Sequence, residues 1–292
     1  RPGYDGHCRE RGLAGGPGRV VRFAVPTEGT TGWDDVVRGP IEFSNAEIED
    51  FVILRSNGTP MFLVANAVDD VDMGITHIIR GEDLINVTPK VLLLRTALGH
   101  HEQPVFAHLP LIVNEQRKKL SKRRDDVSVA DYRDRGVLAE AMANYLATLG
   151  WGPPDGVEVR PMAEIIERFR LADVTSASAF FDVRKLEHFN GEWIRSLATG
   201  DFIDRCAPWL APPAADWAPE QFDADAFAQM APLVQERMKL LAEVPEYVDW
   251  LFLDAAPVDE DSWSKTMTKR SAEASAVLAA VADAFASCEW LA

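Results

Sequence analysis

Hydrophobic positions in the first part of the chain form short runs that favour strands. The runs at 20–25 and 51–54 are rich in Val, Ile and Phe. Turn-forming pairs stand at 39–40 (Gly-Pro) and 57–58 (Asn-Gly). Short runs separated by such turns predict an antiparallel or mixed α/β module over residues 1–64.

The following segment predicts a strand, a helix and a second strand. Apolar runs at 75–79 and 105–113 have the length and composition of strands. Between them, Thr88 is expected to cap a helix that carries Pro89 in its first turn and ends at Gly99. Strand, helix and strand at this spacing indicate a parallel α/β sheet with a crossover connection.

Helical spacing dominates from residue 128 onward. Ser128 and Asp131 form the start of a helix in the manner of a capping box. Apolar residues then recur at helical spacing through 138–149, and Gly150 is expected to end that helix. The Pro-rich segment 207–219 is a candidate boundary between two helical modules. The predicted fold class is therefore α/β followed by all-α.

Length and composition exclude several classes of protein. With 292 residues and 47% hydrophobic content, the chain can bury a core and is expected to form two or three domains. No run approaches the roughly 20 apolar residues of a membrane helix, and no secretory signal opens the chain, so a cytoplasmic location is expected. The three cysteines are far apart, which argues against a disulfide framework.

One short segment is strongly basic in an acidic chain. The formal net charge is -16, and residues 211–292 carry fifteen acidic against five basic side chains. Residues 117–124 nevertheless contain six Lys or Arg. Two lysines three apart, Lys119 and Lys122, can follow charge as it moves from a triphosphate to a leaving pyrophosphate, and Ser121 adds a hydrogen bond. On these residues alone, a solvated basic loop remains the alternative.

The basic segment is one of several motifs that resemble a single family. Its core, Lys-Leu-Ser-Lys-Arg at 119–123, resembles the Lys-Met-Ser-Lys-Ser signature loop of class I aminoacyl-tRNA synthetases. The other motifs occur in the same order as in bacterial-type glutamyl-tRNA synthetases, which the chain resembles over residues 1 to about 200. They are found at residues 54–60, 65–70, 73–83, 107–112, 145–151 and 189–194.

The resemblance implies an activity and a domain order. The activity is ATP-dependent ligation of L-glutamate to tRNA(Glu) through glutamyl-adenylate, which releases AMP and pyrophosphate. Residues 1–64 correspond to part of the acceptor-stem-binding insertion, and 65–124 to the second half of the Rossmann-type catalytic domain with the KLSKR loop. Residues 125–200 correspond to a helical stem-contact domain, and 201–292 to part of a helical anticodon-binding domain.

The resemblance also implies an amino-acid site at Phe62, Asn66 and Arg80. The guanidinium of Arg80 suits that role, because its fork pairs with a carboxylate in a bidentate way that a neutral amide does not reward. The pairing favours glutamate over glutamine. Phe62 departs from the Tyr of the family and lacks its hydroxyl group.

Nucleotide and RNA contacts follow by the same resemblance. Mg²⁺ is expected to arrive with ATP and to keep much of its water. His7, Cys8 and Glu10 stand where some members of the family hold half of a zinc site. Cys8 is the one good soft ligand among them, and structural zinc needs four ligands, so no zinc or other protein-bound metal is expected.

The resemblance also implies the residues that contact ATP and tRNA. The expected ATP contacts are Glu82, Asp83, Ile112, Lys119 and Lys122, the catalytic residues are Lys119, Ser121 and Lys122, and the tRNA contacts are Arg123 and Arg124.

One element of the family pattern is missing. Class I synthetases carry a His-Ile-Gly-His-type signature, and none of the six histidines stands in such a context. The sequence therefore predicts a fragment that is inactive alone, derived from a monomeric enzyme that does not bind membranes. Two alternatives stay open: a catalytically inactive tRNA-binding module and a related glutaminyl-tRNA synthetase.

Overall fold

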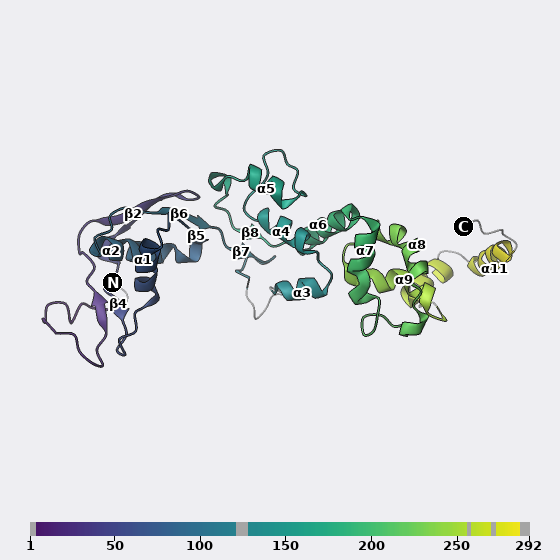
Figure 1. The fold of residues 1–292 in the computed structure, drawn as a ribbon, viewed down its shortest axis with the longest axis horizontal. Helices are drawn as coiled ribbons and strands as arrows, with labels where there is room; N and C mark the ends of the chain where they lie inside the picture. The colour runs from purple at the N-terminus through teal and green to yellow at the C-terminus, as the bar shows by residue number, and fades with distance from the viewer. Residues whose placement is uncertain (1–3, 121–127, 256–257, 270–272, 287–292) are drawn as a thin grey trace. The chain divides into compact units, whose positions relative to one another are not determined.

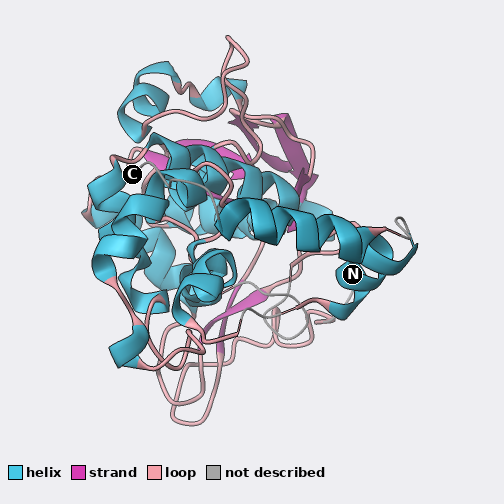
Figure 2. Ribbon diagram, turned by 90° about the vertical axis from the view of Figure 1, so that its right-hand side faces the viewer, coloured by secondary structure: helices cyan, strands magenta, loops and turns pink. Residues whose placement is uncertain are grey.

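The chain folds into two compact units, residues 1–193 and 194–292. Described strands occur only in the first unit, and the described part of the second unit is built from helices and loops. Figure 2 distinguishes helices, strands and loops by colour. The computed structural model describes residues 4–120, 128–255, 258–269 and 273–286.

The first unit contains a four-stranded sheet with the order β3-β2-β6-β5. The β2–β3 pair is antiparallel, whereas β2–β6 and β5–β6 are parallel. The predicted parallel strand-helix-strand unit is therefore confirmed. The strands are β1 (Val21–Phe23), β2 (Thr30–Asp35), β3 (Gly39–Ser44), β4 (Phe51–Leu54), β5 (His77–Gly81), β6 (Val105–Leu109), β7 (Ile112–Val113) and β8 (Ala179–Phe180).

Helices α1 and α2 pack against each other beside this sheet (Figure 1). Helix α2 follows directly from a 3₁₀-helix, η2 (Glu82–Val87), so the chain leaves β5 already in helical conformation. The helices of this unit are α1 (Phe62–Asp72), α2 (Thr88–Ala97), α3 (Val129–Asp134), α4 (Ala139–Ala147), α5 (Met162–Arg168) and the larger part of α6 (Val183–Ser196), with short 3₁₀-helices at Asn45–Glu47 and Leu171–Asp173.

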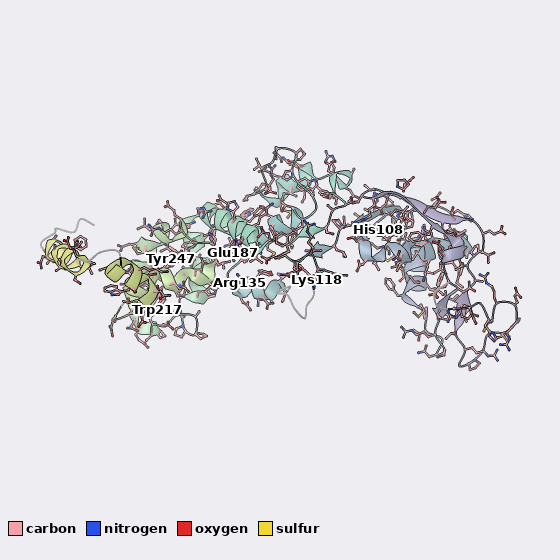
Figure 3. All side chains as sticks on the ribbon, turned by 180° about the vertical axis from the view of Figure 1, so that it is seen from behind. His108, Lys118, Arg135, Glu187, Trp217 and Tyr247 are labelled. Atoms are coloured by element: carbon pink, nitrogen blue, oxygen red, sulfur yellow. The ribbon has the colours of Figure 1, made fainter. Side chains whose placement is uncertain are left out.

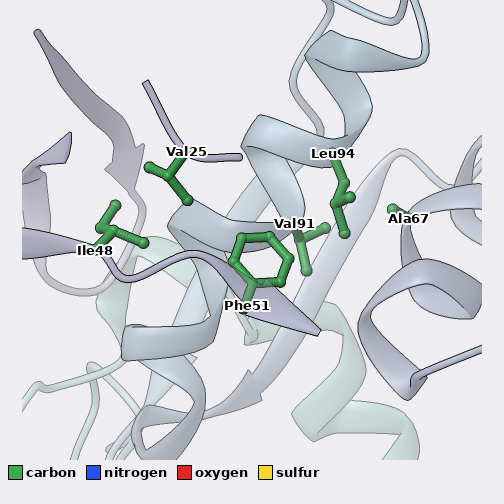
Figure 4. Packing of buried hydrophobic residues seen from close by; sticks show 6 residues of the cluster. All are labelled: Val25, Ile48, Phe51, Ala67, Val91 and Leu94. Atoms are coloured by element: carbon green, nitrogen blue, oxygen red, sulfur yellow. The ribbon is translucent and has the colours of Figure 1, made fainter. Parts of the chain in front are cut away.

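A hydrophobic cluster fixes α1 and α2 to β4. Phe51 of β4 is 5% exposed and stacks on Phe23 of β1 at a centroid distance of 5.3 Å. Figure 4 shows six buried side chains that converge from β4, the two helices and the adjoining loops. Burial of apolar side chains is worth about 25 cal/mol per Å², so this cluster holds α1 and α2 against β4, which pairs with β1, and offsets the loss of chain entropy. Its buried members are Val25, Ile48, Phe51, Ala67, Val91 and Leu94.

Some expected element boundaries are wrong. Thr88 is not an N-cap but the first residue of α2, because η2 runs straight into the helix and Val87 precedes it. Gly39 does not form a turn with Pro40 but begins β3, with φ +74°. The expected strand 105–113 is two strands, β6 and β7, since Pro110 lies between them and lacks an N–H for a ladder.

Other boundaries are confirmed in part. Ser128 caps α3 by accepting a hydrogen bond from the Ala130 amide at 3.2 Å. Helix α4 ends at Ala147, before Gly150, which has φ +85°.

The Pro-rich segment 207–219 does not separate two units: it lies within the second unit, where it contributes the buried ring of Trp217.

The second unit packs its helices around aromatic side chains. Trp217, labelled in Figure 3, is 1% exposed and lies 5.0 Å from the ring of Phe252. Within the described ranges, no helix is both long enough and apolar enough to cross a bilayer. The helices of this unit are α7 (Thr199–Cys206), α8 (Ala224–Gln235), α9 (Val244–Phe252), α10 (Glu260–Trp263), a π-helix (Ser264–Lys269), α11 (Ala274–Ala286) and 3₁₀-helices at Ala207–Trp209, Pro219–Gln221 and Leu241–Glu243.

Candidate functional site

Arg80 lies near the carboxyl end of β5, the edge at which α/β sheets bind ligands. Its guanidinium is held on one side: Nε donates to His108 Nε2 at 3.3 Å, and Nη2 donates to Thr88 Oγ1 at 2.8 Å. Nη1 has no hydrogen-bond partner among the described residues. The outer end of the guanidinium is therefore available to a ligand.

Helix α1 brings one charged side chain, Asp70, close to Arg80. Phe62, Asn66 and Asp70 are four residues apart and share one helix face. Burial lowers the pKa of Arg80, and the nearby Asp70 carboxylate opposes that effect by favouring the charged form. Phe62 is 63% exposed, so its ring is open to a ligand rather than part of the core. Of the predicted trio, Phe62 and Asn66 lie on α1 and Arg80 lies on β5.

A buried carboxylate–imidazole pair lies behind Arg80. His108 Nδ1 is 2.5 Å from Asp35 Oδ2, and both side chains are 0% exposed. The His108 amide and the Trp33 indole also donate to this carboxylate, at 3.1 and 3.3 Å. Figure 3 labels His108 on β6. The strand ends of β2, β5 and β6 are joined here by polar contacts, beside the packed rings of Trp33 and Phe106.

Glu82 links the ends of β5 and β6. Its Oε1 accepts from the Leu111 amide at 3.0 Å, and its Oε2 pairs with Arg38 Nη2. Arg38 Nε also donates to the His108 carbonyl at 3.2 Å. Glu82 and the expected ATP contact Ile112 are therefore brought to the same strand ends. Both carboxylate oxygens of Glu82 already have partners.

Asp83 forms an ion pair with the first lysine of the basic segment. Lys119 Nζ lies 2.7 Å from Asp83 Oδ2, and the two side chains are 58% and 48% exposed. The hydrogen bond from Lys119 lowers the pKa of Asp83 below its usual value. The structure thus brings together two of the predicted ATP contacts, in a pair that water can reach.

A hairpin carries Lys119 to this position. Residues 112–113 and 118–120 run antiparallel, with Leu120 N donating to Ile112 O at 3.1 Å. Asn114 Oδ1 closes the turn by accepting from the Gln116 and Lys118 amides at 3.1 and 3.0 Å. Strand β7 of the hairpin pairs in parallel with β8, which anchors the basic segment. Ser121, Lys122, Arg123 and Arg124 lie outside the described residues.

A cavity of about 260 Å³ lies beside this hairpin. Arg135 lines it and pairs with Glu187 at 3.2 Å, and both are labelled in Figure 3 together with Lys118. The other lining residues are Asn114, Glu115, Gln116, Leu120, Tyr132, Phe181 and Val183.

Among the residues that the structure describes, no three His, Cys, Asp or Glu side chains are grouped to hold a metal ion. His7 Nε2 lies 2.7 Å from Arg11 Nη1, and Cys8 is an exposed free cysteine.

Five residues that contact this site were not among the predicted site residues: Asp35, Arg38, Asp70, Thr88 and His108. Thr88 was expected only as a helix cap. A signal for His108 was present, because a histidine in the middle of the apolar run 105–113 must be satisfied when that strand is buried. The register that pairs Arg80 with His108 is a tertiary feature.

Comparison with known proteins connects both units to one group. Residues 7–188 match the family model described as tRNA synthetases class I (E and Q), catalytic domain, and residues 201–292 match an anticodon binding domain. The chain is 57% identical to a glutamate-tRNA ligase of Thermobifida fusca over 265 residues, which are 91% of this chain and 55% of the relative. A glutamate-tRNA ligase of Frankia casuarinae is 53% identical over 99% of this chain and 61% of its own length.

Solved structures agree with these matches. A crystal structure of a glutamate tRNA ligase from Elizabethkingia meningosepticum, in complex with its amino acid, superposes with a TM-score of 0.76 at 29% identity. The superposition covers 92% of this chain and 56% of that structure. The chain thus spans little more than half the length of the proteins it matches.

Proposed function

Because the chain belongs to the class I tRNA synthetase family for glutamate and glutamine, we propose that it serves the ATP-dependent ligation of L-glutamate to tRNA(Glu). In this reaction glutamate and ATP form glutamyl-adenylate and pyrophosphate. The glutamyl group then passes to the terminal ribose of the tRNA, and AMP is released.

The observation that carries the proposal is the open outer end of Arg80. A guanidinium held through Nε and Nη2 presents Nη1 and the second Nη2 hydrogen as a fork. We assign this fork to the side-chain carboxylate of glutamate. Asn66 on α1 and the exposed ring of Phe62 complete the amino-acid site in this assignment. Glutamine places an amide there, whose NH₂ group meets N–H donors.

ATP is assigned to the ends of β5 and β6. Lys119 is the first group to change partners, because a triphosphate offers it more negative charge than Asp83 does. Glu82, Asp83 and Ile112 contact the nucleoside, and Lys122 and Ser121 act with Lys119 on the phosphates. Mg²⁺ enters with ATP, and no zinc is assigned. Stabilising the charge that develops on pyrophosphate is the chemical contribution of these lysines.

The tRNA contacts extend along both units in this proposal. Residues 1–64 face the acceptor stem, 125–200 the inner elbow and 201–292 the anticodon arm, with 65–124 as part of the catalytic domain. Arg123 of the KLSKR loop and the following Arg124 contact RNA phosphates. We further propose a monomer that works in the cytoplasm without binding membranes.

Glutamate-dependent ATP–pyrophosphate exchange is not expected of residues 1–292 alone. Positioning of the phosphates needs cations on both sides of the triphosphate, and no histidine of this chain stands in a His-x-Gly-His context. Normal exchange activity by this chain would contradict that part of the proposal. The alternative of an inactive tRNA-binding module has no use for a carboxylate fork at Arg80.

Amino-acid binding tests the proposal directly. Titration of the ¹⁵N-labelled chain with L-glutamate should shift the Arg80 Nε–H signal, and L-glutamine should act at concentrations at least about tenfold higher. Arg80→Lys keeps the charge but loses the fork and should abolish this preference. Equal responses to the two amino acids, or an unchanged preference in Arg80→Lys, would show that Arg80 does not select the substrate.

A further inference from the structure

The strand register places His108 next to Arg80. Strands β5 and β6 are parallel, and Arg80 pairs with His108 in their ladder, so the two side chains project from the same face. Thr88 contacts both: its Oγ1 accepts from Arg80 Nη2 at 2.8 Å and lies 3.1 Å from His108 Nε2. Thr88 and His108 are each 0% exposed. One edge of the guanidinium is therefore bonded to a fully buried surface.

Asp35 determines which ring nitrogen of His108 carries the proton. Burial raises the pKa of Asp35, but hydrogen bonds from His108, Trp33 and Val37 outweigh that effect, and its pKa is below 3.8. An ionised carboxylate only accepts, so His108 Nδ1 carries a hydrogen toward Asp35 Oδ2. In the neutral ring, Nε2 then has a lone pair that accepts from Arg80. With the hydrogen on Nε2 instead, the Nε2–H of His108 would face the Nε–H of Arg80, and neither group could accept a hydrogen bond.

The charges around His108 favour this neutral tautomer. Burial lowers the pKa of His108, the Asp35 carboxylate opposes this, and the cations Arg80 and Arg38 lower the pKa further. Arg38 is itself paired with Glu82. Asp35 is therefore negative and Arg80 positive, and the neutral imidazole of His108 lies between them. The three side chains together carry no net charge.

We propose that Asp35, His108 and Thr88 are positioning residues of the amino-acid site, which act through Arg80. They fix the inner edge of the guanidinium, and the outer fork is thereby held in one orientation for a carboxylate. This inference rests on the proposed function, because it takes the ligand of Arg80 to be glutamate. A mobile Arg80 would lose more rotamer entropy on binding, and the preference for glutamate over glutamine would fall.

The first experiment needs no ligand. In ¹⁵N spectra of the 292-residue chain near pH 7, His108 should be the neutral tautomer with hydrogen on Nδ1. Asp35→Asn should convert it to the Nε2–H tautomer, because the new amide donates to Nδ1, and should speed exchange of the Arg80 Nε–H with water. An imidazolium or an Nε2–H tautomer in the unmodified chain would overturn the inference.

The second experiment measures glutamate affinity in matched variants. Thr88→Val removes the hydroxyl and should weaken glutamate binding about tenfold with little change for glutamine, whereas Thr88→Ser should bind as the unmodified chain does. Tyr145→Phe removes a buried hydroxyl outside this network and should leave the affinity unchanged. If Thr88→Val and Tyr145→Phe weaken binding equally, the effect is a general loss of stability and the inference is wrong.

The two experiments separate this inference from the proposed function. If His108 has the stated tautomer and Asp35→Asn frees Arg80, the positioning network exists. An unmodified chain that shows no response to glutamate would then overturn the proposed ligand rather than the network.

Discussion

Two sets of opposite charges lie at the same strand ends and differ in burial. Asp35, His108 and Arg80 form a chain of contacts whose carboxylate and imidazole are 0% exposed. Asp83 and Lys119 form a single pair whose side chains are about half exposed. The buried set has several bonds per group, whereas the exposed pair has one bond of 2.7 Å.

The difference shows that burial decides how firmly a set of charges is held. Charges in a low dielectric interact strongly and are costly to separate, so the buried set keeps one geometry. An exposed pair is worth little and exchanges partners readily. Under the proposed function, the first behaviour would serve the binding of an amino acid, and the second would serve a lysine that follows charge onto pyrophosphate.

The largest expected effect is on stability and comes from Asp35→Ala. Removing this carboxylate leaves His108, Trp33 and Arg38 donors without an acceptor, so the free energy of unfolding should fall by about 3–5 kcal/mol in urea titrations. Asp34→Ala is the matched control, since Asp34 is exposed on the same strand. Equal losses in the two variants would show that the buried network adds nothing to the free energy of unfolding.

A smaller loss is expected from Tyr145→Phe, which removes a buried hydrogen bond without a charge. Tyr145 Oη accepts from the Asp182 amide at 2.7 Å, and burial raises the pKa of Tyr145 to about 12. The variant should lose about 1–2 kcal/mol of unfolding free energy in the same titration. A loss as large as that of Asp35→Ala would mean that burial alone, rather than charge, explains why the Asp35–His108–Arg80 set is held more firmly than the Asp83–Lys119 pair.

Acidification should weaken the buried network next. The pKa of His108 is below its usual 6.5, so the unfolded chain binds more protons than the folded chain once the pH falls under 6.5. The unfolding free energy that His108 contributes is therefore fully present above pH 6.5. It is lost as the pH falls below 6.5, with a slope of up to about 1.4 kcal/mol per pH unit. His108→Gln should remove this slope in urea titrations between pH 7 and 5. A slope that persists in that variant would assign the titration to another group.

The smallest effect is expected at the exposed pair. Lys119→Met should change the free energy of unfolding by less than about 0.5 kcal/mol. Because Lys119 lowers the pKa of Asp83, the same variant should return that pKa toward 3.8, as measured by ¹³C NMR of the carboxylate. A stability loss above about 1 kcal/mol would place this pair with the buried network instead.

Local sequence signals predicted the elements well. The strand-helix-strand unit followed from apolar runs and from Pro89, and the cap at Ser128 followed from its spacing to Asp131. These features depend on neighbours in the chain. The resemblance to a synthetase family supplied Phe62, Asn66 and Arg80, and the comparisons confirm that family.

The network behind Arg80 was not predicted, because it depends on contacts between distant segments. Asp35 and His108 are separated by 73 positions, and nothing local to either indicates the other. Thr88 was interpreted as a cap because Thr before Pro commonly starts a helix. The 3₁₀-helix η2 satisfied that end of the helix instead, which left the Thr88 hydroxyl to bind Arg80.

Side-chain NMR exchange rates test the comparison most directly. In one ¹⁵N experiment on the 292-residue chain, the Nε–H of Arg80 is compared with that of Arg133, which is 74% exposed and pairs with its neighbour Asp134. Exchange with water should be at least about tenfold slower for Arg80, because its Nε–H donates to Nε2 of the buried His108. Equal exchange rates for the two arginines would contradict the claim that the buried network holds the Arg80 guanidinium in place.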